Sequence, residues 1–272
     1  MKHFRYALSS APYAPETAPI LLKGDICSNL KKAEELGYDA IEIHLRENDP
    51  IDLLSIQRTM QQTGVRISMI MTGRLFTEGH CSLLDDSPCT MQAAIEGTRQ
   101  YIDLAASLGA DIVIGWLTGN IPQAALCRRK YLDRLAANLK LLSVYAKDKN
   151  VRVNIEVINR YEVNTFTTAK SLIGFIQDYH LDNICIHLDS FHMNLDECSF
   201  KEAILSAKHH LGYFHLADNT RFYPGSGMID FKEILKLLRS VNYGGYLSVE
   251  CLPRPTGEEA AKLAIQYMKS IE

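Results

Sequence analysis

The chain has 272 residues, of which 47% are hydrophobic and 22% are charged, with a net charge of -3 and a pI of about 6.3. A compact fold of this length buries about 75% of the surface of its unfolded chain, so a disulfide framework or structural metal is not needed for folding. The charge balance supplies no basic face for phosphates, and no apolar run approaches the roughly 18 residues of a membrane span. The composition therefore argues against a nucleic-acid or membrane partner.

The cysteines and the N-terminus indicate a cytoplasmic protein. The seven cysteines are odd in number, are scattered and include no C-x-x-C pair, which is typical of reduced thiols. The first residues, MKHFRYALSS, lack the apolar core of a signal peptide.

Short runs rich in β-forming residues recur along the chain with helical patterns between them. Eight strands are predicted, at residues 3–9, 40–45, 66–71, 111–116, 151–157, 184–189, 213–218 and 246–250. Helix starts are predicted at Pro50 after Asp49, at Ser87-Pro88 and after Asp230. Helix ends are predicted at three glycines, Gly37, Gly64 and Gly109.

Strands that alternate with helices indicate parallel strands joined by right-handed crossovers. Eight such units in about 250 residues fit a (β/α)8 TIM barrel better than an open doubly wound sheet. No G-x-G-x-x-G follows the first strand, and no linker or low-complexity tract divides the chain. We therefore expect an α/β protein with one TIM barrel domain over residues 1–272.

Alternate residues of a barrel strand point into the barrel or out toward the helices. In the fifth strand Val153, Ile155 and Val157 are predicted to face the helices, which turns Asn154 and Glu156 inward. The same parity turns further polar residues of other strands inward: Glu42, His44, His187, Asp189, His215, Ser248 and Glu250. Strands five, six and eight therefore end on an inward carboxylate, and strand seven supplies an imidazole.

Three carboxylates and one imidazole at one barrel mouth would repel one another and lose hydration at a cost of several kcal/mol without a neutralising cation. Three oxygen ligands and one nitrogen suit Mn²⁺, Mg²⁺ or Co²⁺ better than a structural zinc site. The carboxyl ends of the strands are also where barrel enzymes place their chemistry. The predicted metal ligands are Glu156, Asp189, His215 and Glu250.

Motifs between residues 150 and 255 resemble a known family. They are EVINRYE around Glu156, DSFHMN from Asp189, HLADNTR from His215 to Arg221, PGSG at 224–227 and YGGYLSVE ending at Glu250. The pattern is similar to the sugar isomerase and epimerase superfamily with the xylose-isomerase-like barrel. Within it, the chain most resembles the ketose 3-epimerases, the group that includes D-tagatose 3-epimerase and D-psicose (allulose) 3-epimerase.

The resemblance implies an isomerase that inverts C3 of a ketose by proton abstraction and return through a metal-stabilised enediolate. It implies one Mn²⁺, Co²⁺ or Mg²⁺ on the same four ligands, with Glu156 and Glu250 as the acid/base pair. The substrate's O1 to O3 oxygens are expected to be held by Glu162, His192 and Arg221. The family also implies a homo-oligomer, a dimer or a tetramer.

Several points stay open at this level. Glu42, His44 and His187 are expected to make polar contacts behind the site or in the core. Three aromatic residues could form an apolar wall against the sugar or pack in the core, and the sequence favours neither: Tyr6, Phe76 and Trp116. The PGSG loop predicts a turn, with a phosphate site as the alternative.

Alternative functions use the same fold. They are an aldose–ketose isomerase, an epimerase acting on a phosphorylated sugar or a 3-keto-glycoside, and an inosose-type dehydratase. A non-catalytic sugar-binding protein is an alternative of another class. An AP endonuclease with this barrel needs more metal ligands and a basic surface, which the pI opposes. The sequence does not select the sugar.

Overall fold

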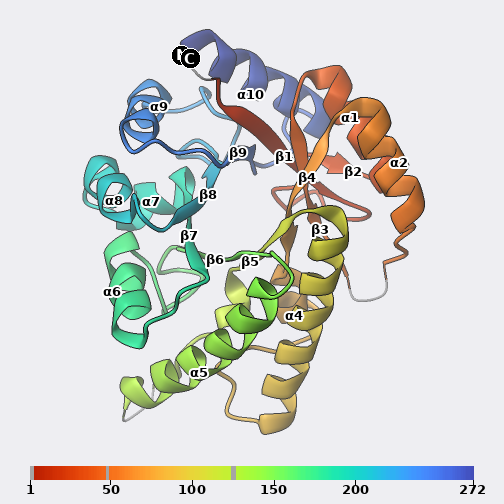
Figure 1. Ribbon diagram of the computed structural model, residues 1–272. Coiled ribbons are helices and arrows are strands. Elements are labelled where there is room, and N and C mark those ends of the chain that lie inside the picture. The colour runs from red at the N-terminus through yellow and green to blue at the C-terminus, as the bar shows by residue number, and fades with distance from the viewer. Residues whose placement is uncertain (1–2, 47–48, 124–126) are drawn as a thin grey trace.

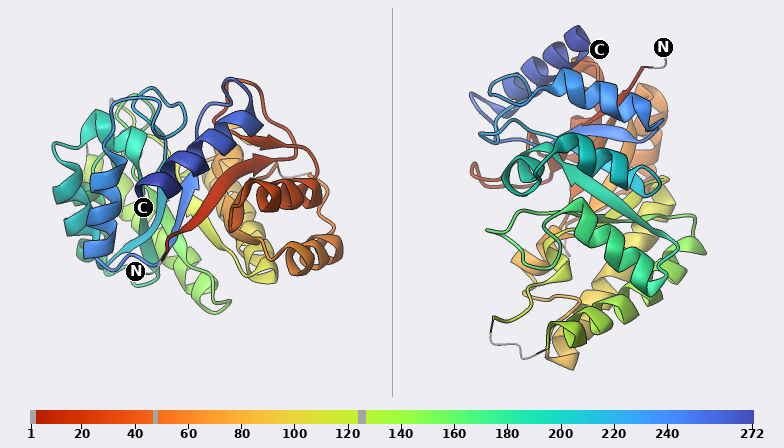
Figure 2. Two further views of the ribbon diagram at one scale, coloured as in Figure 1. Left: turned by 90° about the horizontal axis from the view of Figure 1, so that it is seen from above. Right: turned by 90° about the vertical axis from the view of Figure 1, so that its left-hand side faces the viewer.

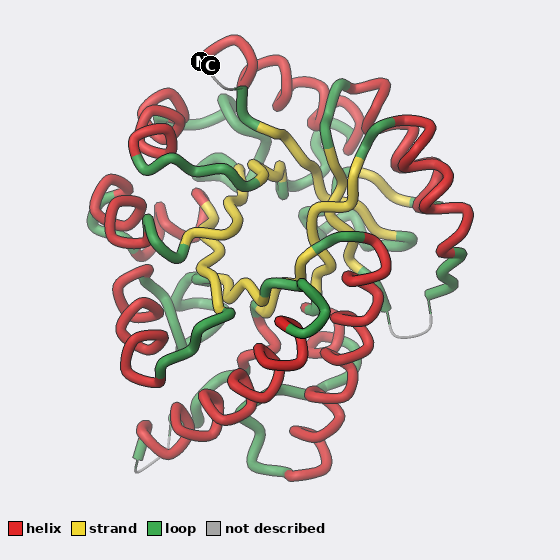
Figure 3. The backbone as a smooth tube through the Cα atoms, viewed as in Figure 1, coloured by secondary structure: helices red, strands yellow, loops and turns green. Residues whose placement is uncertain are grey.

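The structure is a computed structural model that describes residues 3–46, 49–123 and 127–272. Eight parallel strands form a closed barrel, in which β1 pairs with both β3 and β9. These strands are β1 (Arg5–Ala11), β3 (Ala40–His44), β4 (Arg66–Met71), β5 (Asp111–Ile114), β6 (Val153–Glu156), β7 (Ile184–Asp189), β8 (Leu211–Leu216) and β9 (Tyr246–Val249). Figure 3 shows the strands as a ring surrounded by helices. The predicted (β/α)8 barrel is confirmed.

Helices connect the strands around the outside of the barrel (Figure 1). The longer helices are α1 (Ile26–Leu36), α2 (Leu53–Thr63), α4 (Pro88–Leu108), α5 (Arg128–Lys147), α6 (Ala169–Tyr179), α8 (Phe200–Ala207), α9 (Phe231–Ser240) and α10 (Gly257–Ile271). Three short helices follow the carboxyl ends of strands: α3 (Gly73–Thr77), the 3-10 helix η1 (Trp116–Thr118) and α7 (Ser190–Asp196). These short helices place side chains at the barrel mouth.

Most predicted helix boundaries are confirmed. The Ser87 side chain caps α4 with Pro88 in the first turn, and the Asp230 side chain accepts from the Glu233 N–H at the start of α9. Gly37, Gly64 and Gly109 end α1, α2 and α4 in the left-handed conformation. Each glycine lacks the Cβ that would oppose a positive φ, so the helix stops there and the next strand begins.

Several predicted strand boundaries differ from the structure by one or two residues: β1 covers 5–11 rather than 3–9, β6 153–156 rather than 151–157, and β8 211–216 rather than 213–218. Two further differences have a local cause. Helix α2 begins at Leu53 rather than at Pro50, because the Asp52 side chain caps it by accepting from the Ser55 N–H. Strand β5 ends at Ile114, two residues early, because the chain turns at Gly115 into the 3-10 helix η1. This turn moves Trp116 out of the strand.

A ninth strand, β2 (Leu22–Lys23), extends the sheet at the barrel mouth. It pairs in parallel with the last residues of β1, with Leu22 opposite Ser10, while β9 pairs with the first half of β1. The segment between β1 and β2 is thereby tied to the rim of the barrel.

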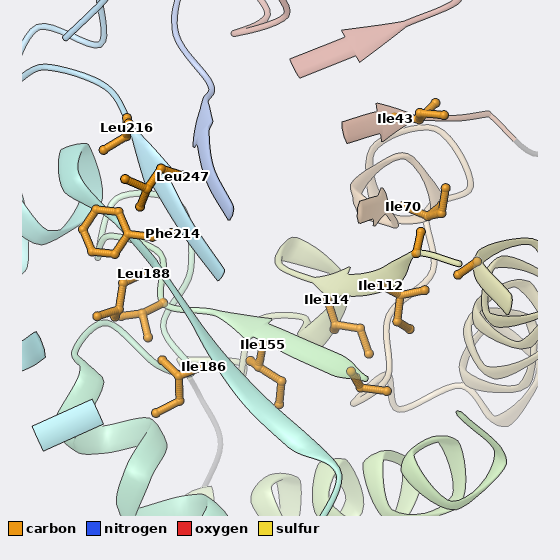
Figure 4. Close-up of a cluster of buried hydrophobic side chains, with 14 of the residues drawn as sticks. Ile43, Ile70, Ile112, Ile114, Ile155, Ile186, Leu188, Phe214, Leu216 and Leu247 are labelled. Carbon is orange, nitrogen blue, oxygen red and sulfur yellow. The ribbon is translucent and has the colours of Figure 1, made fainter. Parts of the chain in front are cut away.

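The strand residues predicted to face outward form the core between barrel and helices. Figure 4 shows Ile155, Ile186, Leu188, Phe214 and Leu247 within this cluster, and all five are fully buried. Burial of each such side chain contributes about 1.5–3 kcal/mol. The alternation confirms the predicted parity, because the polar residues between them point into the barrel.

The beginning of β1 and the end of α10 lie close together (Figure 1 and Figure 2). The Phe4 N–H donates to Glu272 Oε1 at 2.9 Å, and the Tyr6 hydroxyl lies 3.3 Å from Glu272 Oε2. Across the described ranges, no helix combines the length and apolar character needed to cross a bilayer.

Candidate active site

The four predicted metal ligands converge at the carboxyl end of the barrel. Glu156 and Asp189 are the last residues of β6 and β7, His215 lies one residue before the end of β8, and Glu250 follows β9 directly. In the sheet register Asp189 is opposite His215. Strand parity therefore brings residues up to 94 positions apart in the sequence into one cluster, and His215 lies at its centre.

One imidazole nitrogen faces all three carboxylates. His215 Nδ1 lies 3.8 Å from Glu156 Oε1, 3.7 Å from Asp189 Oδ2 and 3.6 Å from Glu250 Oε2. Both His215 Nδ1 and Asp189 Oδ2 are buried and have no hydrogen-bond partner among the residues that the structure describes. Buried polar atoms are normally paired, so these two atoms require another partner. A donor set of three carboxylate oxygens around one imidazole nitrogen suits a divalent cation.

Overlapping groups around this centre also have metal-ligand spacing. They are Glu156 with Asp189 and His192, Glu42 with His215 and Glu250, and Glu156 with His187 and His215. Each group shares residues with the predicted four. The site is therefore a dense cluster of ligand atoms.

Burial and mutual repulsion separate the pKa values of the acids. Burial raises the pKa of Glu156 well above its usual range, and the neighbouring Glu250 and Asp189 carboxylates raise it further, against the opposing effect of His215. Burial also raises the pKa of Glu250, although His215 and Arg221 oppose the shift. For Asp189 burial is outweighed by Arg221 and the imidazoles, so its pKa lies below the usual range. Two acids that hold protons readily thus flank one that stays ionised.

Arg221 lies against the cluster, as predicted. Its Nη2 donates to Glu250 Oε2, and its Nη1 lies 3.4 Å from Asp189 Oδ2 and 3.1 Å from His192 Nε2. The guanidinium also stacks over the Phe191 ring at 4.6 Å from the centroid. The fixed charge of Arg221 therefore compensates part of the negative charge of the cluster.

The loop after β8 holds Arg221 in an unusual backbone conformation. Its φ is +62°, which non-glycine residues seldom adopt. Two backbone hydrogen bonds fix this turn: the Arg221 N–H donates to the Asp218 carbonyl, and the Leu252 N–H donates to the Arg221 carbonyl, both at 2.8 Å. The left-handed backbone at Arg221 costs some conformational energy, and it directs the side chain toward the site.

Glu162 and His192 meet through a shared partner. The Asn159 amide lies 2.7 Å from His192 Nδ1 and donates to Glu162 Oε1 at 2.8 Å. The Trp116 indole N–H donates to Glu162 Oε2 at 3.0 Å. Burial lowers the pKa of His192 to about 3, against the opposing effect of Asp189, so this imidazole is neutral. The structure therefore brings the three predicted substrate-binding residues to the same mouth.

A cavity of about 610 Å³ opens over the cluster. Its floor includes Glu156 and Glu250 together with the three predicted substrate-binding residues. Further lining residues come from the loop after β1 (Pro15, Thr17, Ala18, Pro19 and Ile20) and from α3 after β4, where the sequence predicted no individual site residue. His44 also lines the cavity, although parity alone could not distinguish a cavity position from a core position.

The three aromatic residues considered for the cavity wall lie in different places. Trp116 lines the cavity, whereas Tyr6 is buried in the core with its hydroxyl near Glu272. Phe76 packs against the core and does not line the cavity. Phe191 lines it instead, and its place between Asp189 and His192 in the DSFHMN motif was the available signal.

The PGSG loop is a turn built on one carboxylate. Asp218 Oδ2 accepts from the Gly225 and Gly227 N–H groups at 3.0 and 2.8 Å, and Asp218 Oδ1 accepts from the Ile229 N–H at 3.1 Å. These N–H groups are therefore satisfied within the loop. The predicted turn is confirmed, and the phosphate-site alternative for this loop is wrong.

Comparisons with known proteins agree with this geometry. The family model described as "Xylose isomerase-like TIM barrel" matches residues 30–271. An L-ribulose 3-epimerase from Mesorhizobium japonicum is 32% identical over 224 residues, which are 81% of this chain and 73% of that protein. A 3-dehydro-D-guloside 4-epimerase from Escherichia coli is 25% identical over 232 residues, which are 83% of this chain and 87% of that protein.

A solved structure of an L-ribulose 3-epimerase superposes with a TM-score of 0.84 at 23% identity, covering 99% of this chain and 96% of that one. At this identity the superposition shows the shared fold. The relatives are named as epimerases, which are isomerases. The chain therefore belongs to the xylose isomerase-like TIM barrel family, and it is an enzyme of the isomerase class.

Proposed function

We propose that this protein is a divalent-cation-dependent sugar epimerase that inverts C3 of a ketose. The observation that carries the proposal is the pair of buried carboxylates, Glu156 on β6 and Glu250 after β9, on the floor of one cavity. They stand three strand steps apart around the barrel, and both have raised pKa values. Several relatives named as 3-epimerases of ketoses support this choice of reaction.

Epimerisation at C3 removes the proton next to the C2 carbonyl and returns a proton to the opposite face of the same carbon. This chemistry needs two proton-transfer groups on opposite sides of the sugar. Glu156 and Glu250 supply them: one carboxylate removes the proton while the other, protonated, delivers one. Carboxylates placed as general acid and base contribute roughly 10²–10⁴ in rate.

The remaining site residues bind and orient the sugar. Arg221 places a fixed positive charge beside the oxygens on which charge develops. Glu162 and His192 bind hydroxyl and carbonyl oxygens of the sugar, from O1 to O3. The Asn159 amide contacts both side chains and fixes their relative orientation. A cation held by Glu156, Asp189, His215 and Glu250, with Mn²⁺, Co²⁺ or Mg²⁺ as the candidates, would supply Lewis-acid stabilisation of the developing negative charge.

A second candidate is a 4-epimerase of a 3-keto-glycoside. A relative named 3-dehydro-D-guloside 4-epimerase covers 83% of this chain, and the cavity of about 610 Å³ leaves room beyond one sugar ring. The same two glutamates would remove and return the proton at C4, next to a C3 carbonyl. The two candidates differ in the carbonyl position of the substrate and share the proton-transfer residues.

The cytoplasmic location of the protein and its assembly as a dimer or tetramer stay predictions.

The test is an NMR assay in D₂O with Mn²⁺ or Co²⁺ over free ketoses, their phosphates and 3-keto-glycosides. We expect a C3 epimer that carries deuterium at C3. Glu250→Gln should keep the fold and lose about 10²–10⁴ in rate. The control is Glu197→Gln, the same change at a partly buried carboxylate outside the cavity. An aldose product, a dehydrated product or no inversion in any substrate would refute the proposal.

A further inference from the structure

Glu42, in β3, is a fully buried carboxylate in the barrel interior. It lies next to the four predicted cation ligands Glu156, Asp189, His215 and Glu250, here called the cation cluster. Its Oε2 accepts from His215 Nε2 at 2.9 Å and from the Tyr213 hydroxyl at 3.1 Å. Its Oε1 faces His44 Nε2 at 3.5 Å, and that nitrogen lies 3.7 Å from Glu250 Oε1. One carboxylate thus contacts an imidazole of the cation cluster and an imidazole of the cavity wall.

We propose that Glu42 is a positioning residue for the cation site, which fixes His215 in the form with the proton on Nε2 and the lone pair of Nδ1 toward the three carboxylates. The inference rests on the proposed function, because it assigns a role to the residue behind a predicted ligand. It goes further by naming which imidazole nitrogen binds and what selects it.

The selection follows from hydrogen-bond chemistry. A neutral imidazole carries one proton on one of two nitrogens, and the partner of one nitrogen decides which. An ionised carboxylate only accepts hydrogen bonds, so His215 Nε2 must carry the proton at 2.9 Å from Glu42. In the cation-loaded protein Nδ1 would then offer its lone pair to the cation, on the side where the three carboxylates lie 3.6 to 3.8 Å away. Ligating histidines commonly have such a carboxylate partner on the other nitrogen.

Neighbouring rings and hydroxyls hold the arrangement in place. The His187 ring packs edge-on against His215, with 4.0 Å between centroids, so the imidazole cannot turn over without displacing it. The Tyr213 hydroxyl bonds both to Glu42 and to Ser68 Oγ, the latter at 2.7 Å. The Ser68 hydroxyl in turn donates to the Ile41 carbonyl at 3.1 Å. The side chains around Glu42 are therefore held by further hydrogen bonds within the barrel.

A role confined to core stability accounts poorly for this carboxylate. Replacement of a buried charged pair by apolar side chains of similar volume is often neutral or stabilising, so burial of Glu42 brings no advantage in stability by itself. Its advantage lies in orientation, because both of its oxygens contact imidazoles that border the reaction centre.

The first test measures Mn²⁺ affinity by calorimetry on chelator-treated protein. Glu42→Gln should weaken binding by about 10- to 100-fold, because the amide can donate to Nε2 and drive the proton onto Nδ1. Asp196→Asn is the matched control: it makes the equivalent acid-to-amide change at a buried carboxylate that pairs with Arg160 away from the cluster, and it should leave Mn²⁺ affinity close to that of the wild type. Equal affinities in wild type and Glu42→Gln, or equal losses in both variants, would overturn the proposal.

The second test reads the proton position directly and needs no variant to fold. Long-range ¹H–¹⁵N spectra of the histidine ring nitrogens in the Mg²⁺-loaded wild type should show His215 with a proton on Nε2 and none on Nδ1. A proton on Nδ1 would overturn the proposal. Both tests are made without substrate. A protein that binds Mn²⁺ through His215 and epimerises no sugar would refute the proposed function and leave the role of Glu42 standing.

Discussion

Replacement of Asp189 by asparagine should abolish most of the thermal stabilisation that a divalent cation gives this protein. Asp189 Oδ2 is buried, lies 3.7 Å from His215 Nδ1 and has no hydrogen-bond partner within the described part of the chain. The other oxygen, Oδ1, accepts from the Phe191 N–H at the start of α7, a bond that asparagine retains. Asp189→Asn therefore removes a charged ligand with little change in shape.

The size of the effect follows from linkage. A cation that binds only the folded state at 100 times its Kd adds about 2.7 kcal/mol to the free energy of unfolding. For a barrel of this length each kcal/mol raises Tm by about 2–4 °C, which gives roughly 5–10 °C for the wild type. If the variant binds about 100-fold more weakly, the same concentration equals its Kd and adds only about 0.4 kcal/mol, or roughly 1 °C.

The assay is a thermal melt of chelator-treated protein with and without Mn²⁺, Co²⁺ or Mg²⁺, followed by circular dichroism. Asp196→Asn is the matched control, because Asp196 is also a buried carboxylate but pairs with Arg160 away from the cluster. It should keep the full cation-induced rise in Tm. A wild type that shows no rise with any of the three cations, or an equal rise in Asp189→Asn, would refute the assignment of this ligand.

Three further outcomes are expected. Burial and the neighbouring carboxylates raise the pKa of Glu156, so this side chain must lose its proton before it can bind the cation. Mn²⁺ affinity should therefore weaken as the pH falls. Calorimetry in buffers of different ionisation enthalpy should show the proton release on binding. Trp116→Phe removes the hydrogen bond to Glu162 and should raise KM by roughly 5-fold, the equivalent of about 1 kcal/mol, while Mn²⁺ affinity stays unchanged; an unchanged KM would contradict the role of Glu162. Gly227→Ala would place a methyl group 2.4 Å from Asp218 Oδ1 and should lower the free energy of unfolding by about 1–3 kcal/mol in urea titrations, whereas wild-type stability would refute this account of the loop.

The positions of the predicted ligands could be obtained from the sequence because strand parity is a strict rule. Once Ile155 is assigned to the helix side, Glu156 must point into the barrel, and a closed parallel barrel brings the carboxyl ends of all strands to one mouth. The helix-ending glycines were equally predictable, since a left-handed residue leaves a local signal in the sequence.

The partners of each inward residue were beyond the sequence. Parity gave Glu42 and His215 the same direction, but their hydrogen bond joins residues 173 positions apart and depends on the depth of each side chain in the barrel. Local geometry separates Trp116, which the 3-10 helix η1 places in the cavity, from Tyr6, which packs in the core beside Leu247. The start of α2 was misplaced because Pro50 and Asp52 offer competing signals, and the side-chain cap at Asp52 prevails.

The lining of the cavity comes from both halves of the chain. The cation cluster and its acids belong to β6 through β9, in the last 120 residues, whereas the loop after β1, α3 and Trp116 come from the first half. Chimaeras should exploit this division: exchanging the loops after β1 and β4 with those of a relative would change which sugar fits, while the proton-transfer half of the barrel is inherited intact. Under the proposed function, the fold thus separates the part that could vary with substrate from the part that would carry the reaction.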